Sequence, residues 1–152
     1  MADYNVQDEY KPANIACVIN ASNYQGVPAN VLLAIGSVEG GKNGQAVKNR
    51  NGTYDLGHMQ INTSTYKAEI ARYGISMDDV RWDGCKNVEI AAYLLKKRLT
   101  ENNGQDFWTK VANYHSKTPL YNSKYKNKIQ PLAHRWAEWL QEQYQHAKVV
   151  YK

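Results

Sequence analysis

The sequence is poor in several features that define other classes of protein. Its 152 residues include two cysteines, one phenylalanine and four prolines. The cysteines, Cys17 and Cys85, are too far apart for a Cys-x-x-Cys redox motif, and no His/Cys cluster has zinc-binding spacing. No segment approaches the roughly 20 consecutive apolar residues that a membrane-spanning helix requires. We therefore expect no membrane span and no metal site.

The N-terminus also lacks the pattern of a secretory signal peptide. Residues 1–9 are acidic and polar, whereas a signal peptide has a basic segment followed by an apolar one. Two alternatives follow: a cytoplasmic protein, or a mature chain in which a starting methionine replaces a removed signal. The two cysteines favour the second alternative if they are bridged, whereas two buried free thiols are the usual state in the cytosol.

Composition predicts one soluble, ordered domain over residues 1–152, with a core at about 12–146. Apolar residues make up 43% of the chain, the mean hydropathy is −0.69 and the net charge is +5. A basic surface favours an anionic partner such as nucleic acid, acidic lipid or a cell-wall polymer. We expect no nucleic-acid partner, because the sequence has no zinc finger, RNA-binding motif or recognition helix. We expect a monomer.

Hydrophobic periodicity predicts a mainly helical chain. Spacing and boundary residues predict helices over about 12–24, 28–39, 62–73, 87–102, 107–114 and 131–145. Between the second and third, Asn51-Gly52 is a tight-turn signal, and the apolar pattern around it predicts short strands within 48–61. The fold class is thus α+β, predominantly α, with a small β-hairpin. In the last helix, Leu132, Trp136, Leu140 and Tyr144 lie one turn apart.

One acidic residue ends an apolar helical stripe. Leu32, Ile35 and Glu39 are spaced i, i+3 and i+7, so they share one face of a helix. Burial raises the pKa of a carboxyl group, which lets it hold a proton near neutral pH. Such a group is the general acid that glycosidic bond cleavage needs. In the alternative interpretation, Glu39 faces water at the helix end, as most glutamates do.

The aromatic residues are unusual in kind. The chain has 12 Tyr and 4 Trp but only 1 Phe. Tyr and Trp combine a flat apolar face with a polar edge, which suits sugar rings. The alternative is ordinary packing, and we expect Trp136 and Trp139 to belong to the core of their helix.

Four motifs follow one another along the chain. They are Val38-Glu-Gly40, Gly57-His-Met-Gln-Ile-Asn62, Asn87-Val-Glu-Ile-Ala-Ala-Tyr-Leu94 and Ala112-Asn-Tyr-His-Ser116. Together they resemble the soluble lytic transglycosylase domain over about residues 17–129. The closest likeness is to small cell-wall-cleaving members encoded with conjugation, secretion and pilus systems. The resemblance implies a lysozyme-like fold, with the hairpin next to the catalytic helix.

The resemblance also implies roles for residues. Glu39 takes the position of the catalytic acid/base, and Gln60 that of a residue that binds sugar next to the scissile bond. The other expected substrate-binding residues are Met59, Asn62, Tyr114, His115 and Ser116. Small periplasmic members carry a cysteine pair at the positions of Cys17 and Cys85, which implies a disulfide and a periplasmic or secreted location. The family usually has Ser after the catalytic Glu, whereas this chain has Gly40, so another group such as Ser37 would have to supply any contact of that Ser.

The implied reaction cleaves the β-1,4 bond between N-acetylmuramic acid and N-acetylglucosamine of peptidoglycan and leaves 1,6-anhydro-muramic acid ends. It needs one carboxyl group and no cofactor, and it would open the wall for a secretion, conjugation or pilus apparatus. The Asp55 region also resembles animal-type lysozyme, so one alternative is a muramidase that uses Glu39 and Asp55. Otherwise Asp55 pins the hairpin turn through hydrogen bonds. A third alternative is a non-catalytic glycan-binding component of a secretion apparatus.

Overall fold

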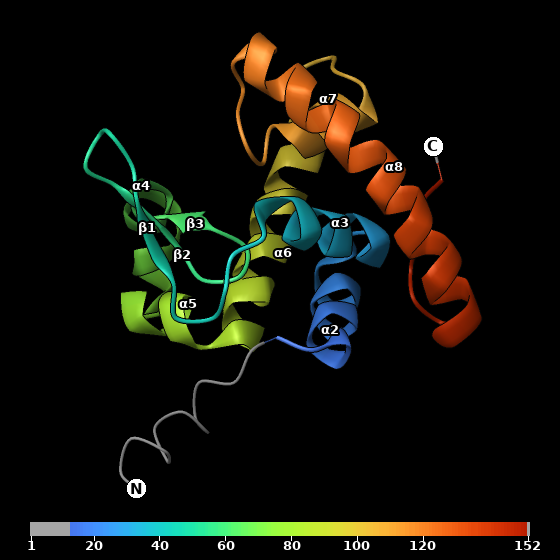
Figure 1. Ribbon diagram of the computed structural model, residues 1–152, viewed down its shortest axis with the longest axis horizontal. Helices are drawn as coiled ribbons and strands as arrows, with labels where there is room; N and C mark the ends of the chain where they lie inside the picture. Colours follow the sequence, from blue (N-terminus) through green and yellow to red (C-terminus); the bar gives the residue numbers. More distant parts are fainter. Residues whose placement is uncertain (1–12, 152) are drawn as a thin grey trace, which may run out of the picture. The chain divides into compact units, whose positions relative to one another are not determined.

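The computed structural model describes residues 13–151, most of which are helical (Figure 1). The larger helices are α2 (Ile15–Gln25), α3 (Ala29–Glu39), α6 (Gly84–Thr100) and α8 (Pro119–Gln143). The shorter ones are α4 (Thr63–Thr65), α5 (Met77–Trp82) and α7 (Phe107–Ala112). Three short strands, β1 (Ala46–Lys48), β2 (Tyr54–Leu56) and β3 (Ile61–Asn62), form one antiparallel sheet. The predicted class, mainly α with a small β element, is confirmed. None of the helices described is both long and apolar enough to cross a membrane.

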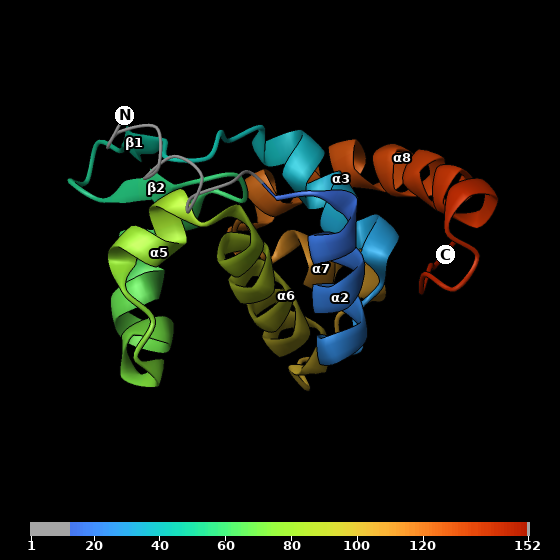
Figure 2. The ribbon, with the colours of Figure 1, turned by 90° about the horizontal axis from the view of Figure 1, so that it is seen from below.

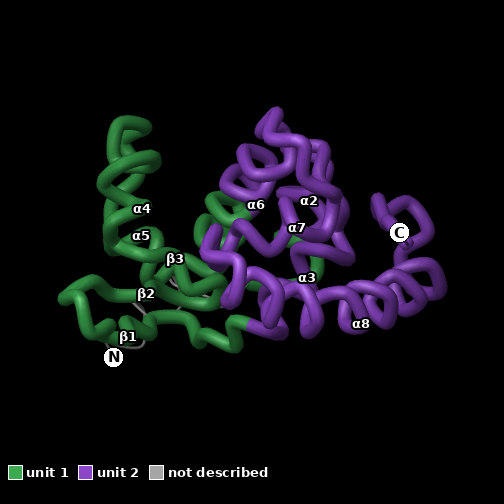
Figure 3. Tube along the Cα trace, turned by 90° about the horizontal axis from the view of Figure 1, so that it is seen from above, with its two compact units in different colours: residues 1–18, 39–91 green, residues 19–38, 92–152 purple. Residues whose placement is uncertain are grey.

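The chain divides into two compact units (Figure 3). Among the described residues, the first unit comprises 13–18 together with Glu39–Ala91, and the second comprises Ile19–Val38 together with 92–151. Both units contribute buried apolar residues. Buried residues of the first include Leu56, Met59, Ile61, Ile70, Val80 and Val88, and those of the second include Val31, Leu32, Ile35, Leu95, Ile129 and Leu140. The single domain over residues 1–152 stays a prediction.

The sheet of the first unit is a hairpin with a third strand added. Strands β1 and β2 lie side by side as an antiparallel pair (Figure 2). Val47 is opposite Asp55 in this pair, and β3 continues the sheet with Asn62 opposite Asp55. The hairpin turn is closed by Asn49 N–H donating to Thr53 O at 2.8 Å. Gly52 has φ +85°, a conformation that glycine adopts without strain. The predicted turn at Asn51-Gly52 is therefore confirmed.

The predicted helix over 62–73 is replaced by a more irregular segment. Asn62 caps α4, but the chain then passes through a π-helical turn, Tyr66–Ile70, and a 3-10 turn, Ala71–Tyr73, that ends at Gly74. Helix α5 follows and was not predicted from the sequence. It is short, and its start is fixed locally by the Ser76 hydroxyl, which accepts a hydrogen bond from Asp79 N–H at 3.0 Å.

The last helix is longer than the sequence indicates. Helix α8 begins at Pro119 rather than near Pro131. Proline is well tolerated in the first turn of a helix, whose amides lack intrahelical partners, and its presence at residue 131 does not break α8. The buried face also differs from the predicted stripe, since it comprises Asn122, Tyr125, Ile129, Ala133, Ala137 and Leu140. The expectation that Trp139 is a core residue is wrong, because 36% of it is exposed.

The remaining predicted helices match their predicted ranges within a few residues. Helix α3 ends at Glu39, as expected, and α7 begins at Phe107. Helix α2 begins at Ile15, and the predicted start at Pro12 lies outside the described residues. In α6, which corresponds to the helix predicted over about 87–102, the buried apolar residues include Val88, Ala91, Ala92 and Leu95.

Candidate active site

Glu39 is the last residue of α3 and is half-buried. Leu32 and Ile35, which precede it on the same helical face, are 1% and 0% exposed. Gly40 follows with φ +62°, the left-handed conformation that commonly ends a helix. Glu39 therefore lies where the apolar stripe of α3 ends, as a partly exposed residue.

The next residue, Gly41, is packed against the turn formed by residues 57–60. Its N–H donates to His58 O at 3.2 Å, and its carbonyl oxygen lies 3.1 Å from His58 Nδ1. A Cβ atom on Gly41 would lie 2.1 Å from Gly57 O, so any larger residue would displace one of the two backbones. The segment that follows Glu39 is thus fixed to this turn by close backbone contact.

Gln60 ends this turn in a strained conformation. Its φ of +54° is the only positive value among non-glycine residues of the described chain. Its side-chain amide donates to Gly57 O at 3.0 Å and would lie 2.7 Å from a Cβ on Gly41. Such backbone conformations cost about 1 to 3 kcal/mol each and often occur at functional sites. The structure therefore brings Gln60 next to the segment that follows Glu39.

Met59 and Asn87 anchor the same turn. The Met59 side chain is 1% exposed and belongs to the core of the first unit. Its N–H donates to the Asn87 side-chain oxygen at 2.8 Å, and the Asn87 amide donates to Leu56 O and Val80 O. Asn87 was part of a motif in the sequence, but nothing in spacing or periodicity indicated that its side chain holds the turn.

Asp55 and Asn62 face each other across β2 and β3. The Asn62 amide donates to Asp55 Oδ1 and to Thr53 Oγ1, both at 2.9 Å. The Asn62 side-chain oxygen accepts hydrogen bonds from the Ser64 N–H at 2.9 Å and the Ser64 hydroxyl at 2.6 Å. All four hydrogen-bonding positions of the Asn62 side chain are thus engaged within the protein. Asp55 is half-buried and belongs to this hairpin network.

Tyr114, His115 and Ser116 lie in the second unit, whereas the site residues from Glu39 to Asn62 lie in the first. They form a tight turn after α7, in which the Ser116 N–H donates to Ala112 O at 3.1 Å. The Ser116 hydroxyl accepts a hydrogen bond from the Thr118 N–H at 3.1 Å, just before α8 begins. The turn that contains the three residues is therefore closed by local hydrogen bonds on both sides of Ser116.

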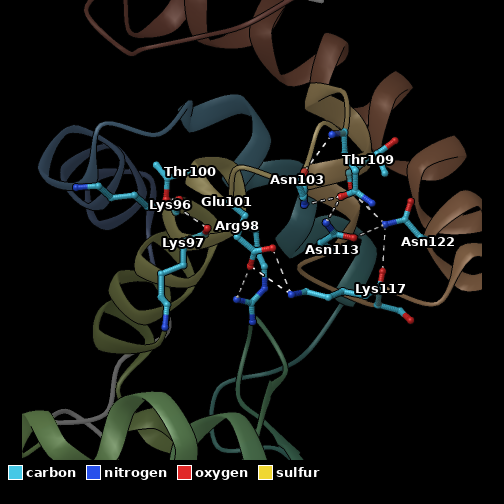
Figure 4. Close-up of polar contacts among 12 residues, drawn as sticks. Lys96, Lys97, Arg98, Thr100, Glu101, Asn103, Thr109, Asn113, Lys117 and Asn122 are labelled. Atoms are coloured by element: carbon cyan, nitrogen blue, oxygen red, sulfur yellow. Dashed lines mark hydrogen bonds and ion pairs between the residues drawn. The ribbon is translucent and has the colours of Figure 1, made fainter.

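Asn122 supports this turn from α8 (Figure 4). It is 5% exposed, and its side-chain amide lies within hydrogen-bond distance of Ser116 O, Thr109 O and Asn113 Oδ1. The Asn113 amide in turn donates to Gln105 Oε1 at 2.7 Å. The start of α8 and the loop before α7 are thereby joined to the turn that carries Tyr114.

The Glu101 carboxylate links the end of α6 to the segment that follows Ser116. Glu101 lies 3.3 Å from Lys117 Nζ and 3.5 Å from Arg98 Nη1 (Figure 4). These groups are partly exposed, so the ion pairs contribute about 1 kcal/mol or less each. Their role is to hold Lys117, which follows Ser116, close to the end of α6.

Cys17 and Cys85 form a disulfide, as the resemblance implied. Their Cα atoms are 5.3 Å apart, and 68 positions separate them in sequence. Closing a loop of this length stabilises the folded state by roughly 4 kcal/mol in the chain-entropy model. Elsewhere in the described chain, no group of three or more His, Cys, Asp or Glu side chains could hold a metal ion.

Comparison with known proteins identifies the family. A family model described as the transglycosylase SLT domain matches residues 16–130. The chain belongs to the transglycosylase SLT family. No curated protein matches it.

The SLT match covers part of each unit and contains every predicted site residue, from Cys17 to Ser116. The soluble lytic transglycosylase resemblance is therefore confirmed, with bounds within one residue of those predicted. Membership of the SLT family supports a lytic transglycosylase activity on peptidoglycan. A peptidoglycan substrate is consistent with a location outside the cytoplasm.

Proposed function

We propose that this SLT-family chain cleaves the β-1,4 bond between N-acetylmuramic acid and N-acetylglucosamine and leaves 1,6-anhydro-muramic acid ends. The observation that carries the proposal is the half-buried Glu39 at the end of α3, followed by a segment packed against the turn that contains Gln60. An acid in such a position can exchange protons with a substrate while a neighbouring amide binds the sugar.

In the proposed reaction, protonated Glu39 donates its proton to the glycosidic oxygen as the bond to the anomeric carbon breaks. The N-acetyl group of the substrate stabilises the positive charge that develops, so no second carboxylate is required. Ionised Glu39 then takes the proton of the muramyl 6-hydroxyl, whose oxygen attacks the anomeric carbon. The ring closes without consuming water, and Glu39 returns to its protonated state. Gln60 hydrogen-bonds to the sugar next to the scissile bond, and Tyr114 is a further substrate-binding residue.

The muramidase alternative would give Asp55 a second catalytic role. The contacts of Asp55 favour a local role instead, because Asn62 donates to its carboxylate within the hairpin network. A non-catalytic glycan-binding role is disfavoured because the acid Glu39 is present at the end of α3. We therefore place the reaction on one carboxyl group.

The proposal extends to where the protein acts. The disulfide favours an oxidising compartment, so we place the protein in the periplasm or outside the cell. The Tyr114-His-Ser116 variant resembles that of secretion-associated members, which supports local opening of the wall for a secretion, conjugation or pilus apparatus. The net charge of +5 suits an anionic cell-wall polymer.

The decisive experiment is mass spectrometry of the products released from purified peptidoglycan. We expect muropeptides that end in 1,6-anhydro-muramic acid, and a loss of about 100-fold or more in rate for Glu39→Gln, because the general acid is removed. Asp55→Asn is the matched carboxylate control, and it should retain most of the activity. Reducing-end products one water heavier, together with an inactive but folded Asp55→Asn, would instead establish a muramidase. Full activity of Glu39→Gln would remove Glu39 from the mechanism.

A further inference from the structure

We propose that Asn87 is a positioning residue for the reaction, because its side chain holds the turn of residues 57–60 against the segment that follows Glu39. The inference rests on the proposed function and extends it to a residue that does not touch the substrate. Asn87 acts through two contacts in succession: its own bonds to the turn, and the bonds of the turn to Gly41.

The first contact is a buried set of three hydrogen bonds. Asn87 is 1% exposed. Its side-chain oxygen accepts the Met59 N–H at 2.8 Å, and its amide donates to Leu56 O at 3.0 Å and to Val80 O at 2.8 Å. One side chain thus joins the end of β2, the middle of the turn and α5. Buried backbone groups that lose such partners are costly, so each bond constrains the position of the turn.

The turn depends on this support because its own backbone is unfavourable. It begins at Gly57 with φ +68° and ends at Gln60 with φ +54°. A non-glycine residue in that region persists only where the surrounding structure fixes it. Within the turn, the Gln60 N–H donates to Gly57 O at 3.2 Å, but this bond leaves the position of the turn relative to α5 and α6 undetermined.

The fit between Asn87 and the turn is close. A Cβ atom on Gly57 would lie 2.6 Å from the Asn87 side-chain nitrogen and 3.0 Å from Val80 O. Glycine at this position therefore allows the amide to reach both carbonyl oxygens. The three hydrogen bonds of Asn87 then fix the distance between its side chain and the turn.

The second contact is between the turn and Gly41, and it fixes the segment that follows Glu39 relative to the turn. Gly41 donates to His58 O, and its Cα lies so close to Gly57 O that no side chain fits between them. A shift of the turn must therefore shift Gly41 or break these contacts. Because Gly41 is two residues after Glu39, loss of the Asn87 bonds should disturb the carboxyl group and Gln60 together.

Asn30 provides a matched control in the second unit. It is 0% exposed, its amide donates to Ala133 O at 2.9 Å and Val150 O at 2.8 Å, and its oxygen accepts the Val150 N–H at 3.0 Å. Both asparagines therefore bind two carbonyl oxygens and one N–H of the backbone. Asn30 joins the start of α3 to the C-terminal segment, and no predicted site residue takes part in its bonds.

The experiment compares Asn87→Ala with Asn30→Ala on soluble, uncrosslinked glycan strands, under conditions in which circular dichroism shows both variants folded. We expect a fall in kcat of about 100-fold for Asn87→Ala, because small displacements of a reacting group have effects of this size. Its KM should change less than its kcat, because three of the expected substrate-binding residues, Tyr114, His115 and Ser116, lie outside the turn that Asn87 holds. Asn30→Ala should retain its kcat within about threefold while losing similar stability.

If Asn87→Ala does not fold, Asn87→Asp takes its place, with Asn30→Asp as the control. Aspartate keeps the size of the side chain and an acceptor for the N–H group, but it cannot donate to the carbonyl oxygens. Unchanged kcat in a folded Asn87 variant, or an equal loss of kcat in the Asn30 control, would overturn the proposal.

A second measurement separates this proposal from the proposed function. Amide hydrogen exchange at Gly41 reports its bond to His58 O without any substrate. We expect faster exchange at Gly41 in the Asn87 variants and unchanged exchange in the Asn30 variants. If wild-type protein fails to cleave peptidoglycan, the proposed function fails, and this exchange still tests whether Asn87 sets the position of Gly41. Unchanged Gly41 exchange in the Asn87 variants would show that it does not.

Discussion

The imidazole ring of His115 lies parallel to the phenol ring of Tyr125, with the centroids 4.7 Å apart and the planes at 4°. Tyr125 belongs to the buried face of α8 and is 4% exposed, whereas His115 is exposed. His115, a residue of the predicted site, thus stacks on an aromatic ring of α8, the helix that follows it. Stacked aromatic pairs contribute about 0.5 to 1.5 kcal/mol beyond the area they bury.

This stacking predicts a difference between two substitutions of Tyr125. In Tyr125→Leu the imidazole loses the ring beneath it, so the His115 ring protons should lose their upfield ring-current displacement in the NMR spectrum. Tyr125→Phe retains the ring and should retain most of the displacement. Identical His115 resonances in wild type and Tyr125→Leu would show that the two rings do not stack in solution.

The two glycines that follow Glu39 should respond differently to substitution. A Cβ on Gly40 meets nothing within 4 Å, so Gly40→Ala introduces only the strain of its positive φ, about 1 kcal/mol. A Cβ on Gly41 would lie 2.1 Å from Gly57 O, which is backbone and cannot rotate away. We expect Gly41→Ala to lower the free energy of unfolding by about 3 kcal/mol or more, measured by urea denaturation with the disulfide intact. Equal losses for the two variants would contradict the close packing of Gly41 on the turn.

Asp106 predicts an acid-dependent contribution to stability. It caps α7, and hydrogen bonds from the Thr109 side chain, the Thr109 N–H and Lys126 lower its pKa from 3.8 to about 2. A depressed pKa in the folded state stabilises the protein above the unfolded value of 3.8. That contribution is lost as the pH falls toward 2, where the carboxylate becomes protonated in both states.

The test compares wild type with Asp106→Asn, which keeps a side-chain cap but removes the charge. The wild type should unfold at the higher temperature at about pH 6, and the difference should shrink as the pH approaches about 2. Because the Asp106 side chain is largely exposed, high salt should also reduce the difference. A difference in melting temperature that is independent of pH would show that the cap acts without its charge.

The parts of the fold that follow from local patterns were predictable. Helix α6, the end of α3 at Glu39 and the Asn51-Gly52 turn each depend on residues close together in sequence, and the structure confirms them. Helix α8 was predicted too short because Pro131 indicated a start, although the residues before it continue the same buried face. The exposure of Trp139 was missed for a different reason: the buried face of α8 is the one that carries Ile129, Ala133 and Ala137.

The candidate site was predictable only in part. The roles of Glu39 and Gln60 are implied by the resemblance and stay predictions, and the motifs did not indicate the positive φ of Gln60 or the contact of Gly41 with Gly57. Those features depend on backbone segments that are far apart in sequence and pack together in the fold. The hydrophobic periodicity of the sequence does not indicate such contacts. Asn87 illustrates the limit, because its partners Leu56 and Met59 are 31 and 28 positions away in sequence.

The disulfide makes a covalent ring of the chain from Cys17 to Cys85, and this ring contains Glu39, the whole sheet and the turn of residues 57–60. The tip of the hairpin, at Arg50, Asn51 and Gly52, is exposed and lies within the ring. A protease that cut the chain at this tip would therefore leave two polypeptides joined through Cys17 and Cys85. Only reduction would separate them, so the first unit can be nicked at the hairpin and still hold its two halves as one molecule.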